Sequence, residues 1–100
     1  MQKKPRSRGR RSDPHDMSRY SLVITHRFRQ DLRRLDAQMH RRVLEVLECL
    51  QEDPFQGRRL TNVAIGQWRI RVGDYRIRYD IEGEQVLLYR VRHRREIYRD

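Results

Sequence analysis

Apolar and basic residues alternate along the last third of the chain, between Gln67 and Tyr98. Arginines fill most positions between the apolar residues, which are Trp68, Ile70, Val72, Tyr75, Ile77, Tyr79, Leu87, Tyr89 and Val91. Successive side chains of a β-strand point to opposite faces of the sheet, so a period of two is typical of half-buried strands. The pattern therefore predicts three strands that share one apolar face and one basic face.

Two turn sequences indicate how these strands pair. Gly73–Asp74 is a two-residue connection with glycine first, as a type II′ hairpin requires, and it places Arg71 opposite Arg76. We interpret Glu82–Gly83–Glu84 as a three-residue loop, which would place Arg76 opposite Arg90. In this register the basic face carries Arg69, Arg71, Arg76, Arg78, Arg90 and Arg92.

The basic face has two interpretations. It is either a solvated surface that keeps an edge-rich sheet soluble, or a site for an anion. Like charges directly opposite each other on a sheet cost a few tenths to about 1 kcal/mol per pair, so a row of them favours a bound anion. The planar guanidinium group of arginine suits phosphate recognition, and the excess here is arginine with almost no lysine. We therefore interpret the basic face as an anion site.

Composition supports a polyanionic partner. The 100 residues include 24 basic and 14 acidic ones, a net charge of +10, and only Lys3 and Lys4 among the basic residues are not arginine. Such a charge favours nucleic acid, a ribonucleoprotein surface or a strongly acidic protein. The single Cys49 excludes an internal disulfide, which fits the cytoplasm. No apolar run approaches the roughly 18 residues of a membrane span, and the basic N-terminus lacks the apolar segment of a signal peptide.

The N-terminal segment and the remainder differ sharply in composition. Residues 1–18 are almost devoid of apolar side chains, so they predict a disordered basic arm, either a nucleic-acid-binding tail or an inert extension. Residues 19–100 predict one small folded domain.

Helical periodicity follows a short first strand. Residues 20–24 alternate as a strand, and Thr25 is a plausible N-cap for a helix with Phe28, Leu32 and Leu35 on one stripe. A second helix ends before Asp53–Pro54 and presents Met39, Val43, Val46, Leu47 and Leu50. The expected fold is α+β: a small antiparallel sheet of about four strands, with an N-terminal helical hairpin packed on its apolar face.

Two further groups of residues are given no special role. Arg58 and Arg59 lie in a turn-rich connection; they either extend the basic surface or are ordinary exposed residues, and we favour the second interpretation. His26 and His40 have no cysteine or carboxylate at ligand spacing, so neither a metal nor another cofactor is expected.

The element order, the segment WRIRVGDYRIRYDI (residues 68–81) and the ending HRREIYR (residues 93–99) resemble the RelE/ParE toxin superfamily, specifically its RelE-like branch. The resemblance covers roughly residues 20–100. It implies a RelE-like fold and the toxin of a type II toxin–antitoxin system, an endoribonuclease that cuts mRNA in the ribosomal A site. The family works without metal, through attack of the 2′-hydroxyl on the neighbouring phosphate. A RelB-like antitoxin is the implied partner, with DNA contacted only through that antitoxin.

Carried over position by position, the resemblance implies that the catalytic residues are Arg69, Arg71, Arg76, Arg92 and Tyr98. Arg76 and Arg92 would clamp the phosphate, and Tyr98 would stack on a base or orient the nucleophile. Further RNA contacts are expected from Arg78, Arg90, Arg94, Arg95 and His93.

The proton-transfer chemistry stays open at this point. The best-known family members carry lysine at the positions of Arg69 and Arg71, and arginine remains protonated where lysine can act as a base. Candidates for the general base are Tyr98, His93, Glu96, or no side chain at all.

Two other functions compete with the nuclease. A ParE-like toxin would inhibit DNA gyrase without cutting RNA, and it has no reason to retain the basic sheet face together with Tyr98. A non-catalytic nucleic-acid-binding module would show steep salt dependence and no cleavage. In every case the exposed arginines suit an acidic partner segment that folds on binding.

Overall fold

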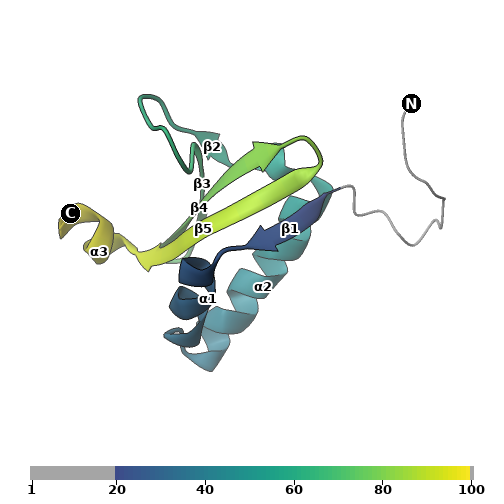
Figure 1. The fold of residues 1–100 in the computed structure, drawn as a ribbon. Coiled ribbons are helices and arrows are strands. Elements are labelled where there is room, and N and C mark those ends of the chain that lie inside the picture. The colour runs from purple at the N-terminus through teal and green to yellow at the C-terminus, as the bar shows by residue number, and fades with distance from the viewer. Residues whose placement is uncertain (1–19, 100) are drawn as a thin grey trace, which may run out of the picture.

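The computed structural model describes the backbone of residues 20–99 and the side chains of residues 20–96. The expected basic arm, residues 1–18, lies outside the described residues. The elements are β1 (Ser21–Ile24), α1 (His26–Arg33), α2 (Ala37–Glu52), the short 3₁₀ helix η1 (Pro54–Gln56), β2 (Arg58–Arg59), β3 (Trp68–Val72), β4 (Tyr75–Glu82), β5 (Gln85–His93) and α3 (Arg94–Arg99). Figure 1 shows α1 and α2 side by side against one face of the sheet, with α3 beyond the end of β5.

The α+β fold with an N-terminal helical hairpin on one face of the sheet is confirmed. The sheet has five strands rather than about four, in the order β1-β5-β4-β3-β2. It is also mixed, because β1 runs parallel to β5 while the other pairs are antiparallel. Local alternation marks residues 20–24 as a strand but carries no information about its neighbour. β5 becomes the neighbour of this strand because the two helices lead the chain back across the sheet face.

Two side-chain caps divide the helical hairpin. The Thr25 hydroxyl accepts a hydrogen bond from the Phe28 backbone N–H at 3.2 Å and donates one to the Leu88 carbonyl at 2.8 Å, so the same side chain starts α1 and ties it to β5. An Asp36 carboxylate oxygen accepts from the Met39 N–H at 2.8 Å and starts α2. The predicted Thr25 cap is confirmed, and Asp36 separates the two helices.

The first hairpin has the predicted register, and the second does not. Gly73 has a φ of +60°, and Arg71 lies opposite Arg76. The second turn has only two central residues, with Glu82 paired to Gln85. The three-residue loop is therefore wrong.

A β-bulge then shifts the rest of this pairing. Between the Arg78–Arg90 and Tyr79–Leu88 pairs, β5 has one extra residue, Tyr89. Arg76 consequently lies opposite Arg92, and its expected pairing with Arg90 is wrong. Alternation predicted that Tyr89 would lie on the apolar face, but Tyr89 is not among the core residues. Leu88 is fully buried instead.

The core lies between the helices and the sheet. The helices contribute Phe28, Leu32, Val43, Leu47 and Leu50, and the sheet contributes Val72, Ile77, Tyr79, Val86, Leu88 and Val91. Tyr79 is fully buried, and its hydroxyl donates a 2.7 Å hydrogen bond to the Pro54 carbonyl. A side chain at Gly57 would overlap that hydroxyl, so glycine permits the close approach. Tyr79 thereby anchors η1 and the start of β2 to the middle of the sheet.

Tyr79 also predicts how stability responds to alkaline pH. Burial raises its pKa from 10.0 to about 12, so between these values the phenol ionises in the unfolded chain but not in the folded one. The stabilisation is complete below pH 10 and is lost as pH rises through 12. We expect the free energy of unfolding to fall by roughly 2 kcal/mol more in the parent protein than in Tyr79→Phe between pH 9 and 12.

Urea unfolding followed by circular dichroism at several alkaline pH values measures this difference. At neutral pH, Tyr79→Phe loses about 1 kcal/mol because the Pro54 carbonyl loses its donor. Identical alkaline profiles for the two proteins would contradict the assignment.

Candidate nucleic-acid interface

Arginines occupy two rows across the sheet face opposite α1 and α2. The first row crosses β3, β4 and β5 and consists of Arg71, Arg76 and Arg92. The second row also reaches β2 and consists of Arg58, Arg69, Arg78 and Arg90. Neighbouring strands lie about 4.8 Å apart and each residue advances a strand by about 3.3 Å, so the rows are separated by about 7 Å. All six arginines predicted on one face therefore lie in these rows, joined by Arg58.

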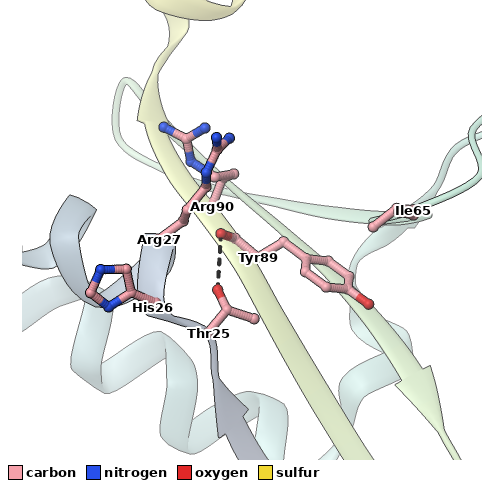
Figure 2. A pocket seen from close by; sticks show the side chains of 6 residues that line it. All are labelled: Thr25, His26, Arg27, Ile65, Tyr89 and Arg90. Atoms are coloured by element: carbon pink, nitrogen blue, oxygen red, sulfur yellow. Dashed lines mark hydrogen bonds between the residues drawn. The ribbon is translucent and has the colours of Figure 1, made fainter.

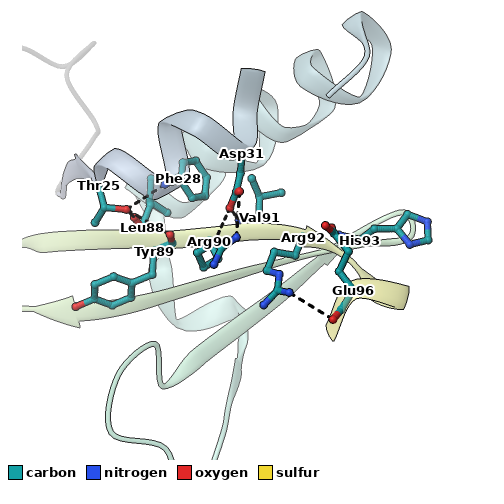
Figure 3. Close-up of polar contacts among 10 residues, drawn as sticks. All are labelled: Thr25, Phe28, Asp31, Leu88, Tyr89, Arg90, Val91, Arg92, His93 and Glu96. Atoms are coloured by element: carbon teal, nitrogen blue, oxygen red, sulfur yellow. Dashed lines mark hydrogen bonds and ion pairs between the residues drawn. The ribbon is translucent and has the colours of Figure 1, made fainter. Parts of the chain in front are cut away.

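Arg90, in the second row, is paired with a carboxylate of its own chain. Its Nε lies 2.8 Å from Oδ2 of Asp31, and its Nη2 lies 3.3 Å from Oδ1 (Figure 3). Asp31 is only 7% exposed, and it also accepts a 3.0 Å hydrogen bond from the Val91 N–H. Because β1 ends at Ile24, α1 rather than a strand covers this part of the β5 edge, and Asp31 supplies the acceptor there.

Arg78 holds the loop between β2 and β3. Its Nε donates to the Gly66 carbonyl at 2.6 Å, and its Nη2 donates to the Ile65 carbonyl at 3.2 Å. Asp80 accepts from the N–H groups of Gly66 and Gln67 at 3.0 and 2.6 Å, so the loop is fixed from both sides. These contacts, like those of Arg90, engage guanidinium N–H groups within the fold, and the roles of Arg78 and Arg90 in RNA binding stay predictions.

Two members of the first row donate hydrogen bonds to backbone carbonyls. Arg76 is only 8% exposed, and its Nη1 donates to the Tyr75 carbonyl at 3.2 Å. Arg92 is half-buried and donates from Nη2 to the Glu96 carbonyl at 3.4 Å. Arg71 is exposed at the β3 end of the row. A partly buried cationic row with one exposed end can bind an anion with little loss of side-chain entropy.

The residues after β5 form a capping arrangement. The His93 N–H donates to a Glu96 carboxylate oxygen at 3.0 Å, and His93 Nδ1 accepts from the Arg95 N–H at 3.1 Å. The His93 ring packs edge-on against Tyr75 with 5.2 Å between centroids, and Figure 3 shows it directed away from Arg92. His93 and Glu96, both candidate bases, are thus occupied in starting α3.

Three other predicted residues belong to α3. Arg94 and Arg95 are exposed in its first turn. Tyr98 lies in the same helix, two residues after Glu96, and its side chain lies outside the described residues. The helix follows Arg92 and His93 directly, so its backbone starts at the end of the first row.

From the sequence, Arg58 is given no special role, but the structure adds it to the second row. It is exposed and lies opposite Arg69 on the neighbouring strand. A cavity of about 360 Å³ opens here, lined by Gln56, Gly57, Arg58, Arg69, Ile70 and Arg71. A strand of two residues is too short to show a period in the sequence. Only its pairing with β3 therefore identifies the face on which Arg58 lies.

A second cavity lies beside Tyr89. Its volume is about 430 Å³, and Figure 2 shows the lining residues Thr25, His26, Arg27, Ile65, Tyr89 and Arg90. Burial is the main cause that raises the pKa of Tyr89, followed by the charge of Asp80 and a hydrogen bond to it. Ile65, on the loop held by Arg78, is 64% exposed. An aromatic ring, an aliphatic side chain and cations in one hollow suit a planar aromatic group such as a nucleobase.

The described residues include neither a cluster of metal ligands nor a helix that could span a membrane. Residues 20–96 contain no group of three or more histidine, cysteine, aspartate or glutamate side chains that could hold a metal ion. No helix described in the structure is long and apolar enough to cross a membrane.

Comparison with known proteins points in one direction. A family model described as "ParE toxin of type II toxin-antitoxin system, parDE" matches residues 22–98. Toxin RelE3 of Methanocaldococcus jannaschii is 32% identical over 82 residues, covering 77% of this chain and 93% of that protein.

Solved structures share the fold. The toxin–antitoxin complex RelBE2 from Mycobacterium tuberculosis matches with a TM-score of 0.69 and 29% identity, covering 78% of this chain and 94% of that one. The chromosomal ParDE system from P. aeruginosa matches with a TM-score of 0.60 and 16% identity, covering 76% and 97%. Proteins named for RelE and for ParE therefore share this fold, and the fold does not choose between their activities.

The Asp31–Arg90 contact predicts a large loss of stability on truncation. Asp31→Ala leaves both Arg90 and the Val91 N–H without this acceptor, so we expect the free energy of unfolding to fall by about 2–4 kcal/mol. Glu45→Ala, at an exposed position of α2, should change it by less than about 0.5 kcal/mol.

Urea denaturation of Asp31→Ala, Arg90→Met and the double variant measures the coupling energy between Asp31 and Arg90. Glu45→Ala is denatured in the same way as the control. We expect a coupling of about 1 kcal/mol or more between the two residues. Additive effects would show that Arg90 does not depend on Asp31.

Proposed function

Since the chain belongs to the RelE/ParE superfamily of toxins from type II toxin–antitoxin systems, we propose that it is a ribosome-dependent endoribonuclease that cleaves mRNA in the A site. One observation carries this proposal: Arg71, Arg76 and Arg92 come from three neighbouring strands and lie in register on one face. The similarity to a protein named Toxin RelE3 is consistent with the same branch.

The first row suits the chemistry of phosphodiester cleavage. The 2′-oxygen forms a bond to the adjacent phosphorus as the bond from phosphorus to the 5′-oxygen breaks, which leaves a cyclic phosphate and a 5′-hydroxyl. The 2′-hydroxyl loses one proton, and the 5′-oxygen gains one. Negative charge grows on the phosphoryl oxygens, and guanidinium groups held in advance stabilise it. Arg76 and Arg92 would contact these oxygens, with Arg92 towards the leaving oxygen and Arg71 at the exposed end.

The local contacts reduce the number of candidates for the general base. Arg69 and Arg71 stay protonated, so neither removes the proton of the 2′-hydroxyl. His93 and Glu96 hold the start of α3 through their mutual capping contacts. Two sources of proton removal then stand: Tyr98, or RNA positioning by the ribosome without a side-chain base.

The partner follows from the same charges. Solved relatives include a toxin–antitoxin complex, RelBE2 of Mycobacterium tuberculosis. We infer a cognate RelB-like antitoxin with an acidic segment that covers the arginine rows and folds as it binds. DNA would be reached only through that antitoxin, and both partners would act in the cytoplasm.

The second candidate is inhibition of DNA gyrase, which the ParE description of the matching family model favours. Such an inhibitor binds a protein and cuts no RNA. Against it stands Arg76, a cation that is 8% exposed and sits in the middle of an arginine row. A row of guanidinium groups suits the phosphates of RNA, and binding to gyrase gives no equivalent reason for that row. A non-catalytic nucleic-acid-binding module is the third candidate.

The nuclease proposal predicts a loss of cleavage when the first row is truncated. Arg71→Ala and Arg92→Ala should each lower the rate of mRNA cleavage on programmed ribosomes by about 100-fold or more, because each removes a donor to the developing charge. The rate is measured from the appearance of new 5′-hydroxyl ends in the A-site codon. The guanidinium group of Arg71 makes no hydrogen bond to the described residues, so we expect its truncation to leave the fold intact.

Arg41→Ala is the charge-matched control, since Arg41 is exposed on α2, against the other face of the sheet. It should cleave at the parent rate. Full cleavage by both row variants would refute the assignment of the row. Intact transcripts with broken DNA in induced cells would establish the gyrase inhibitor instead, and neither lesion would favour the binding module.

A further inference from the structure

We propose a second phosphate-binding site at the β2 edge of the sheet, in which Arg58 and Arg69 bind the RNA phosphate next to the one being cleaved. Arg71, at the exposed end of the first row, also lines the cavity of this edge site. The identity of the ligand as RNA rests on the proposed nuclease function. The site itself rests on the pairing of β2 with β3 and on the cavity beneath it.

Hydrogen-bonding capacity singles out this edge. Arg76, Arg78, Arg90 and Arg92 all direct guanidinium N–H groups to acceptors of their own chain. Among the described residues, the other three members of the two rows make no hydrogen bond or ion pair through their guanidinium groups, and these are Arg58, Arg69 and Arg71. All three line the same cavity of about 360 Å³. The members of the two rows whose guanidinium groups make no contact of this kind are therefore gathered at one place.

The segment that carries Arg58 on one side of the cavity is held in place by contacts within the chain. The Gln56 side-chain amide donates to the carbonyls of Asp53 and Cys49 at 2.9 and 3.1 Å. The buried Tyr79 hydroxyl holds the Pro54 carbonyl, and Gly57 lets this segment lie directly against β3. A cation on a fixed segment loses less entropy on binding than one on a mobile loop, so the cavity is preorganised.

The spacing fits an extended single strand of RNA. Arg69 and Arg71 are two residues apart on β3, which corresponds to about 7 Å along the strand. Successive phosphates of an extended single strand are separated by a comparable length. A backbone with one phosphate on the first row thus brings a neighbouring phosphate to Arg58 and Arg69. Two arginines at Cα-paired positions can also bind one phosphate together. The negative charge of the phosphate then offsets the repulsion between them.

The chain supplies a matched control in the adjacent residue. Arg59 is also exposed and lies on the same two-residue strand, but it is paired with Trp68, so its side chain points to the other face. Arg58→Ala and Arg59→Ala remove the same charge from the same strand. Only Arg58→Ala removes it from the edge site.

The first measurement is binding of the full chain to a single-stranded RNA oligonucleotide with a 2′-deoxy sugar at the cleavage position. Fluorescence anisotropy at several salt concentrations gives the slope of log affinity against log salt. We expect Arg58→Ala to weaken binding about tenfold and to reduce the slope by about 0.7, the value for one single-strand phosphate contact. Arg59→Ala should leave both unchanged. Equal behaviour of the two variants would overturn the proposal.

The second measurement locates the phosphate. Replacing individual phosphates of the oligonucleotide by neutral methylphosphonates should abolish the difference between the parent protein and Arg58→Ala at one position adjacent to the cleaved bond. Loss of that difference at the cleaved position itself, or at none, would overturn the proposal. Weaker antitoxin binding by Arg58→Ala with unchanged RNA binding would also overturn it and assign the edge to the antitoxin.

Single-turnover cleavage on programmed ribosomes separates this proposal from the nuclease function. Arg58→Ala should raise the half-saturating concentration with a maximal rate within about twofold of the parent, whereas Arg92→Ala lowers the maximal rate. A fall in maximal rate for Arg58→Ala would make it part of the cleavage site and overturn the separate edge site. If the parent protein cleaves nothing, the nuclease function fails, and the oligonucleotide measurements still decide whether the edge site exists.

Discussion

The register of β3, β4 and β5 is the constraint on which the arginine rows depend. One extra residue in β5, at the bulge beside Tyr89, moves Arg92 opposite Arg76 and Arg90 opposite Arg78. If Tyr89 continued the regular alternation instead of forming a bulge, Arg90 and Arg92 would lie on the same face as Leu88 and point into the core. The bulge therefore lets β5 contribute Leu88 to the core and Arg92 to the opposite face.

The seven arginines of the two rows divide into groups by their contacts. Arg78 and Arg90 hold a loop and a helix against the sheet, with Asp80 and Asp31 beside them. Their charges are thereby compensated within the fold, which reduces the repulsion that a row of opposed cations would otherwise produce. The positive potential that a polyanion meets comes from the remaining members, which lie along the first row and the β2 edge.

The start of α3 bears on the chemistry as much as the arginines do. His93 follows Arg92 directly, and histidine is the side chain most often used as a general base. Its Nδ1 instead accepts a backbone N–H, and its ring packs against Tyr75 on the core side. In the proposed nuclease, arginine at positions 69 and 71 supplies positive charge and not a base, so proton removal is assigned to Tyr98 or to positioning by the ribosome.

The sequence by itself determined the elements whose signals are local. Side-chain periodicity located the helices and long strands, Thr25 and the Gly73 turn gave their ends, and alternation put arginines on one face. Tertiary structure alone decided the partners: the parallel pairing of β1, the bulge that moved Tyr89, the capture of Arg90 by a buried Asp31 some 59 residues away, and the arrival of Arg58 opposite Arg69. The physical reason is that periodicity reports which way a side chain points along its own strand. Which residue it meets depends on where distant segments pack.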